Sequence, residues 1–103
     1  MPNRHPHAAD LGVGLYQMRL EAGWSQRDLV DRCLAVGRAL SHSQVSKIER
    51  GECYPRPGTL SALARTFGIE NGNVRRFIEE TVSAAARRRE YERAASLNTP
   101  GAG

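Results

Sequence analysis

Two capping-box patterns constrain what the middle of this chain can fold into. Residues 25–28 read Ser-Gln-Arg-Asp, and residues 41–44 read Ser-His-Ser-Gln. In such a box the first side chain accepts a hydrogen bond from the backbone N–H three residues later, and the fourth side chain returns the bond, so a helix begins there. Gly51 is a natural end for the second of these helices. The intervening residues 35–40 have no clear periodicity and are expected to form a turn. The expected inner face of the first helix consists of Leu29, Val30, Cys33 and Leu34.

Apolar residues at helical spacing predict three further helices. The first follows Asp10, which can cap it, and ends near Gly23. Another begins at Pro57 and ends at Gly68, and the last begins after residues 71–73, where either asparagine can cap it. Because no segment alternates in the manner of a β-strand, the chain is expected to be all-α with five helices. The expected inner faces of these three helices are Leu11, Leu15, Met18 and Ala22; Leu60, Leu63, Ala64 and Phe67; and Val74, Phe77, Ile78, Val82 and Ala85.

The chain of 103 residues has the length of one domain with a modest core. Residues 1–9 contain prolines and histidines and are predicted to form a disordered tail. The globular domain is expected to span residues 10–86, followed by a basic helical extension and flexible tail over residues 87–103. Gly12 and Gly14 are expected to weaken the first turn of their helix.

The last helix is predicted to continue beyond its apolar face. Residues 74–85 are expected to pack on the bundle, since the apolar stripe ends at Ala85. Residues 86–96 are strong helix formers with few apolar positions, so they are expected to project as a basic arm, with residues 97–103 disordered. This arm has three interpretations: a solvated helix end, a contact with phosphates, or a docking surface for a partner.

The charge and the composition narrow the class of protein. The net charge is +4, and basic residues outnumber acidic ones in residues 38–65 and 75–93, which is consistent with a polyanionic partner. No stretch is long and apolar enough for a membrane span, and the start has no apolar segment typical of a secretory signal. Cys33 and Cys53 fit no zinc-site spacing and predict reduced thiols. We therefore expect a cytoplasmic protein with no membrane partner, no metal and no cofactor.

The helix over residues 42–50 has a thin apolar face and an unusually compact polar one. Placing Val45 and Ile48 inward turns Ser43, Lys47 and Arg50 almost directly outward, because successive helical residues are rotated by about 100°. Ser46 lies beside this outward strip, and His42 and Gln44 lie on its flanks. Short hydrogen-bonding groups with longer cations suit a helix that enters the major groove of DNA and meets base edges there. The alternative is the ordinary surface of a helical bundle.

Two segments around these helices resemble a known family. Residues 19–29 read RLEAGWSQRDL, and residues 45–51 read VSKIERG. Together they resemble the signature of the Cro/C1-type helix-turn-helix (XRE) family of bacterial and phage regulators, and residues 55–68 resemble its fourth helix. The resemblance covers roughly residues 11–80. It implies a five-helix, lambda-repressor-like domain, here with an extended C-terminal helix. It also implies a nucleoid-associated homodimer that binds a two-fold operator in duplex DNA sequence-specifically and regulates transcription, for example as a repressor.

The resemblance also implies roles for individual residues. Gln26 matches a residue that contacts a DNA phosphate, and Arg19 and Glu49 match a buried structural ion pair. Removing one partner of such a pair would leave a buried, unpaired charge. The expected base-reading positions are His42, Ser43 and Lys47; the expected contacts near the DNA backbone are Ser41, Ser46 and Arg50, with Gln44 at the flank.

The sequence departs from the family pattern in two places. Between Leu29 and Val45 it is longer by several residues, which lengthens the turn over residues 35–41 and bears on how the third helix docks. Val30 stands where the family usually has a small residue. These departures keep a second interpretation open, in which the scaffold and the long last helix serve a protein partner, as in an adaptor or antitoxin-like subunit. A small enzyme is a weaker third interpretation, because the sequence has no catalytic motif.

Overall fold

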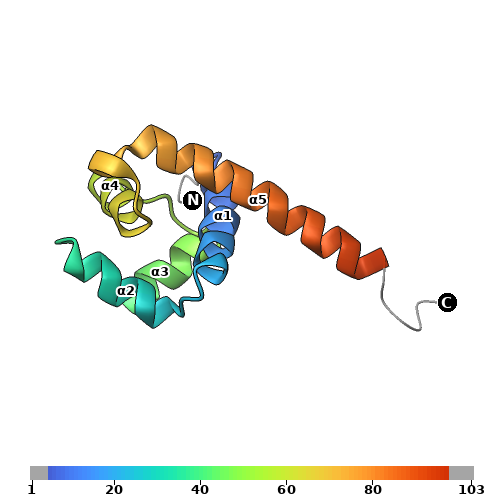
Figure 1. Cartoon of the computed structure of the whole chain (residues 1–103), viewed down its shortest axis with the longest axis horizontal. Coiled ribbons are helices and arrows are strands. Elements are labelled where there is room, and N and C mark those ends of the chain that lie inside the picture. Colours follow the sequence, from blue (N-terminus) through green and yellow to red (C-terminus); the bar gives the residue numbers. More distant parts are fainter. Residues whose placement is uncertain (1–4, 98–103) are drawn as a thin grey trace.

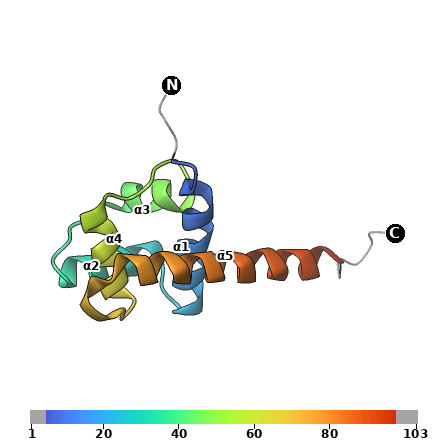
Figure 2. The same ribbon diagram turned by 90° about the horizontal axis from the view of Figure 1, so that it is seen from above.

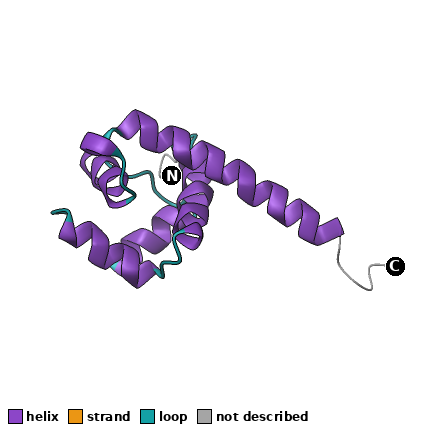
Figure 3. Cartoon of the chain, in the orientation of Figure 1, coloured by secondary structure: helices purple, strands orange, loops and turns teal. Residues whose placement is uncertain are grey.

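The computed structural model describes residues 5–97 and confirms the five predicted helices (Figure 1). Within this range there is no strand (Figure 3). A short 3-10 turn, Glu70–Gly72, precedes the last helix. None of the helices in the described part of the chain has the length and apolarity needed to cross a bilayer. The five helices are α1 (Ala8–Glu21), α2 (Gln26–Ala35), α3 (His42–Glu49), α4 (Pro57–Thr66) and α5 (Val74–Leu97).

Helix α1 contacts both α3 and α5, at the side of the bundle from which α5 projects (Figures 1 and 2). Two glycines make both contacts close. A Cβ at Gly12 would overlap the carbonyl oxygen of Ile48, and a Cβ at Gly14 would overlap the backbone of Thr81. The sequence alone indicated only that these glycines weaken α1. Their role in the fold is to let the backbones of α3 and α5 approach α1.

The core is formed mainly by the predicted inner faces, but three residues predicted to face inward are exposed. Leu34, Val82 and Ala22 were expected inside, but Leu34 is 60% exposed, Val82 is 59% exposed and Ala22 is also exposed. In α5 the buried positions are instead Thr81 and Ala84, because the contact at Gly14 sets which face of α5 meets α1. The core cluster comprises Leu11, Leu15, Leu29, Cys33, Leu40, Val45, Ile48, Leu60, Leu63, Ala64 and Phe77.

A buried threonine in this position needs a hydrogen-bond partner. The hydroxyl of Thr81 donates to the carbonyl oxygen of Ile78 at 2.7 Å, so its burial leaves no unpaired polar atom. Sequence patterning counts threonine as polar and valine as apolar, which explains why it selected Val82 for the inner face.

The N-terminal boundary also differs from the prediction. Helix α1 begins at Ala8, which is fully buried, so residues 8 and 9 belong to the bundle and not to a tail. Asp10 lies inside the helix, where it contacts Arg89, and the N-cap residue His7 makes no side-chain capping bond. The first turn packs where α3 ends: a Cβ at Gly51, which has φ +74°, would lie 2.9 Å from the Cα of Ala9. Residues 5–7 of the predicted tail also contact the bundle: the carbonyl oxygen of His5 accepts from the backbone N–H of Ala8 at 3.0 Å, and the His5 ring stacks on Tyr54 with 3.8 Å between centroids. Residues 1–4 lie outside the described residues.

Helix α5 is continuous from Val74 to Leu97, and its C-terminal part extends beyond the other helices (Figures 1 and 2). The contact with the bundle continues further than Ala85, because Arg87 pairs with Glu21 of α1 and Arg89 with Asp10. The side chains of residues 91–97 are all exposed. The projecting arm therefore begins a few residues later than expected. Leu97 is helical, and the predicted disorder of residues 98–103 falls outside the described residues.

Candidate nucleic-acid interface

Helix α3 begins at a complete capping box. The hydroxyl oxygen of Ser41 accepts from the backbone N–H of Gln44 at 3.0 Å, and Oε1 of Gln44 accepts from the backbone N–H of Ser41 at 2.8 Å. The box at Ser25 and Asp28 opens α2 in the same way, so both predicted helix starts are confirmed. Ser41 and Gln44 thus satisfy backbone groups of α3 and fix where the helix starts. Both side chains are therefore engaged in capping, as the sequence pattern predicted.

The outward side of α3 presents three exposed side chains that have no partner within residues 5–97. His42, Ser43 and Lys47 are all exposed, while Val45 and Ile48 face the core. Within residues 5–97 no hydrogen bond or ion pair engages the side chains of these three residues. An imidazole, a hydroxyl and an ammonium group therefore lie on one short helix, available to an external acceptor or donor.

Two other residues of the predicted interface are joined to each other. Nη1 of Arg50 donates to the hydroxyl of Ser46 at 2.7 Å, and its Nε pairs with Oε2 of Glu52 at 2.6 Å. The hydrogen bond to Glu52, together with the attraction of that carboxylate, raises the pKa of Arg50. The positive charge at the end of α3 is therefore partly balanced within the chain.

The C-terminal end of α3 is held by a buried ion pair with α1. Nε and Nη2 of Arg19 reach the two carboxylate oxygens of Glu49 at 2.6 and 3.0 Å, and the two side chains are only 8% and 5% exposed. Nη1 of Arg19 donates to the carbonyl oxygen of Trp24 at 2.8 Å. The hydrogen bond to Glu49 raises the pKa of Arg19 and outweighs the opposing effect of burial. This two-point geometry fixes the orientation of α3 as well as its position.

Gln26 takes part in the same network. Its Nε2 donates to Oε1 of Glu49 at 2.9 Å, so the first residue of α2 is linked to the last residue of α3. The family resemblance implied that Gln26 contacts a DNA phosphate. In the structure its amide nitrogen is engaged by Glu49, which ties α1, α2 and α3 into one unit.

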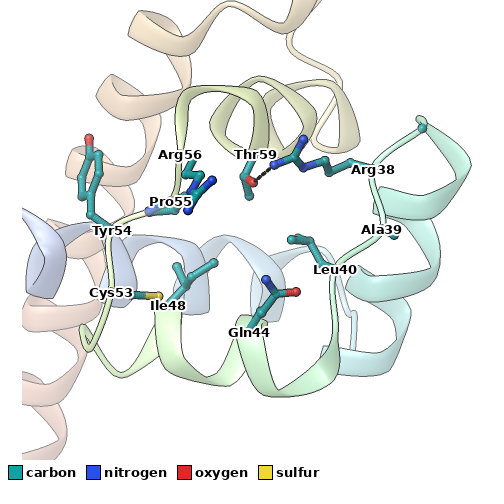
Figure 4. A pocket seen from close by; sticks show the side chains of 11 residues that line it. Arg38, Ala39, Leu40, Gln44, Ile48, Cys53, Tyr54, Pro55, Arg56 and Thr59 are labelled. Carbon is teal, nitrogen blue, oxygen red and sulfur yellow. Dashed lines mark hydrogen bonds between the residues drawn. The ribbon is translucent and has the colours of Figure 1, made fainter.

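The lengthened turn between α2 and α3 is anchored at several points. Leu40 is buried in the core, and Nη2 of Arg38 donates to the hydroxyl of Thr59 at 2.9 Å (Figure 4). Nη2 of Arg65 donates to the carbonyl oxygen of Val36 at 3.2 Å. These contacts join the turn to α4. Sequence periodicity missed them because residues 35–40 have no regular pattern and their partners lie in another helix.

The described residues hold no group of three histidine, cysteine, aspartate or glutamate side chains that could bind a metal ion. The two thiols differ in environment. Burial raises the pKa of Cys33, where a hydrogen bond from Thr66 only partly offsets it, whereas Cys53 is exposed. A protonated, buried Cys33 is a packing residue.

Two capped helices joined by a turn, with the outer face of the second left open, define a helix-turn-helix protein. Comparison with known families agrees: a profile described as a helix-turn-helix domain matches residues 10–78, more than half of the chain. The chain therefore belongs to this helix-turn-helix domain family, a class that indicates DNA binding. Searches of curated proteins and of solved structures found no match.

Proposed function

We propose that the protein is a Cro/C1-type (XRE) regulator of transcription that binds duplex DNA sequence-specifically by placing α3 in the major groove. The observation that supports this proposal is that His42, Ser43 and Lys47 are exposed without a partner within residues 5–97. They lie on a helix whose C-terminal end is fixed by the Arg19–Glu49 ion pair. A groove-reading helix needs free donors and acceptors on a rigid support, since base edges are discriminated by direct hydrogen bonds.

The remaining site residues have supporting roles in this proposal. Ser41 and Gln44 set the start of α3, and Ser46 and Arg50 lie toward the DNA backbone. Nε2 of Gln26 uses one of its two N–H groups on Glu49, and the other can donate to a phosphate at the start of α2, where the free N–H groups of a helix favour an anion. Its bond to Glu49 keeps its amide in place between these two helices.

The test is a selection of bound sequences from a random pool of duplex DNA with the full chain. We expect one short motif, repeated with two-fold symmetry at a spacing of about one helical turn. Affinity for the selected site should fall steeply as salt is raised, because phosphate contacts release counterions. Enrichment of no motif, together with salt-independent binding, would contradict the proposal.

We infer that the DNA-bound form is a homodimer in which the projecting part of α5 contacts the second copy. What favours a protein contact here over phosphate contact is charge pairing. Arg87 and Arg89 are paired with α1, while Arg88 pairs with Glu92 and Arg93 with Glu90. The same observation supports the alternative of a different protein partner, in which the scaffold acts as an adaptor.

Truncation after Glu90 tests the arm while keeping the ion pairs to α1. We expect a folded monomer by analytical ultracentrifugation, with reduced affinity for the selected DNA. A truncated protein that remains dimeric and shows a shallower salt dependence would mean that the arm contacts phosphates instead. A parent chain that is monomeric even on its operator would contradict the homodimer.

A further inference from the structure

A cavity of about 580 Å³ opens between the lengthened turn, α3 and the first turn of α4 (Figure 4). Its volume falls within the range of small-molecule sites, roughly 300–1,000 Å³. One part of its wall is apolar and is formed by Leu40, Ile48, Tyr54 and Pro55. Covering this wall with a carbon skeleton is favourable because it removes apolar surface from water, whereas an isolated ion would not provide this stabilisation.

The polar part of the wall carries two positive charges and no negative one. Arg38 and Arg56 both line the cavity, and none of the eleven lining residues is acidic. In Figure 4 the two guanidinium groups lie on either side of Thr59, whose hydroxyl accepts from Nη2 of Arg38 at 2.9 Å. Across residues 5–97, neither arginine has an ion-pair partner. This contrasts with the arginines at the end of α5.

The start of α4 adds to the positive potential of this wall. Arg56 is the N-cap residue, and no side chain caps the helix. Pro57 has no N–H, and the N–H groups of Gly58 and Thr59 find no acceptor among the described residues, as is usual in a first helical turn. A helix N-terminus carries a partial positive charge that attracts an anion, here beside two unpaired guanidinium groups.

We propose that this cavity binds a small organic anion, with a carboxylate or phosphate held by Arg38 and Arg56 and a carbon skeleton against the apolar wall. A backbone phosphate of DNA would use the guanidinium groups and leave the apolar wall without a partner. The combination of both surfaces in one cavity therefore favours a free small molecule. This site is separate from the open side chains of α3, and it does not require that the protein bind DNA.

Phenyl phosphate is a suitable probe because it joins one apolar ring to one oxyanion. We would titrate it into the full chain without DNA and follow the backbone amides by NMR. Saturable shifts are expected at Gly58, Thr59 and Leu40. The exposed thiol of Cys53 lines the cavity, so its alkylation by N-ethylmaleimide should also slow down, while Cys33 is buried and serves as an internal reference.

Variants separate this site from general attraction to a basic surface. Replacing both Arg38 and Arg56 with Met should weaken binding about tenfold or more, since hydrogen bonds to charged groups are lost. The matched control is Arg75→Met, which removes an exposed arginine of α5 that lines none of the cavity. Thr59→Val removes the anchor of Arg38 while keeping both charges, and it should weaken binding several-fold.

Three results would overturn the proposal. Equal shifts with phenol would show an apolar cleft without anion selectivity. Unchanged shifts in the Arg38→Met, Arg56→Met variant would show that the anion binds elsewhere. Shifts at Gly58 and Thr59 with duplex DNA but not with phenyl phosphate would assign the arginines to backbone phosphates. Because the main titration contains no DNA, it succeeds or fails independently of the proposed function.

Discussion

The outer face of α3 and the arginine segment of α5 (residues 87–93) look alike in the sequence but differ in the structure. Both are polar helical surfaces with basic residues. In the α5 segment all four arginines have carboxylate partners. On α3, Lys47 has none within residues 5–97, and neither does His42. A count of charges therefore does not distinguish these two surfaces, whereas the pairing of each charge does.

The two regions also differ in how they are held to the bundle. Helix α3 is fixed by the Arg19–Glu49 pair, whose side chains are almost fully buried. The α5 segment is held by pairs such as Arg87–Glu21, whose side chains are 48% and 40% exposed. Exposed pairs contribute little free energy, while breaking a buried pair leaves an uncompensated charge. Helix α3 is thus rigidly supported, and residues 87–93 of α5 are more weakly attached.

The largest expected effect comes from breaking the buried pair. Arg19→Ala or Glu49→Ala should lower the free energy of unfolding by about 3–5 kcal/mol, because the remaining charge loses its partner. Chemical denaturation would measure this loss, and the double variant should lose less than the sum. Additive losses below about 1 kcal/mol would mean that the Arg19–Glu49 pair holds α3 no better than the exposed pairs hold residues 87–93 of α5.

The attachment of α5 to α1 is tested by Gly14→Ala. Helix propensity alone predicts a gain of up to about 1 kcal/mol from this change. Because a Cβ would overlap the backbone of Thr81, we instead expect a loss of about 1–3 kcal/mol from forced separation of the helices. Thermal unfolding distinguishes the two signs. Ser83→Ala, on an exposed face of α5, is the control and should have little effect.

The difference in charge pairing is tested by removing one cation from each region. Lys47→Ala should weaken binding to the selected DNA site by about 1–3 kcal/mol and relax preference at one base pair. Arg93→Ala removes a paired arginine from the α5 segment and should change the affinity much less. Fluorescence anisotropy on selected and scrambled duplexes measures both. Equal losses of affinity for the two variants would mean that charge pairing does not determine which cations contribute to DNA binding.

The smallest effect is expected at the exposed pair of Arg87 and Glu21. Hydrogen bonds from Arg87, and then from Gln17, lower the pKa of Glu21 in the folded chain. Since the folded pKa lies below the unfolded one, the pair stabilises the fold above the usual glutamate pKa of about 4.3 and stops doing so as the pH falls through the folded value. Arg87→Ala should therefore cost under about 1 kcal/mol at neutral pH. A loss as large as that at Arg19 would contradict this.

Local features were predictable from the sequence for a physical reason. A capping box joins residues three positions apart, so the boxes at Ser25 and Ser41 depend on little else. The glycine ends at Gly51 and Gly68 have positive φ and are equally local. The pairing of Arg19 with Glu49 came from family resemblance, because nothing in the spacing of two residues this far apart indicates a contact.

The sequence by itself determined the all-α class, the starts of α2 and α3, and which residues of α3 face outward. The tertiary structure decided which face of α5 is buried and which cations remain unpaired. It also decided that Gly12 and Gly14 allow the backbones of α3 and α5 to approach α1. The reason is the range of the interactions. Caps and helical periodicity act within one or two turns, whereas the partners of Arg87, Arg38 and Gln26 come from other helices. Only packing brings those partners together.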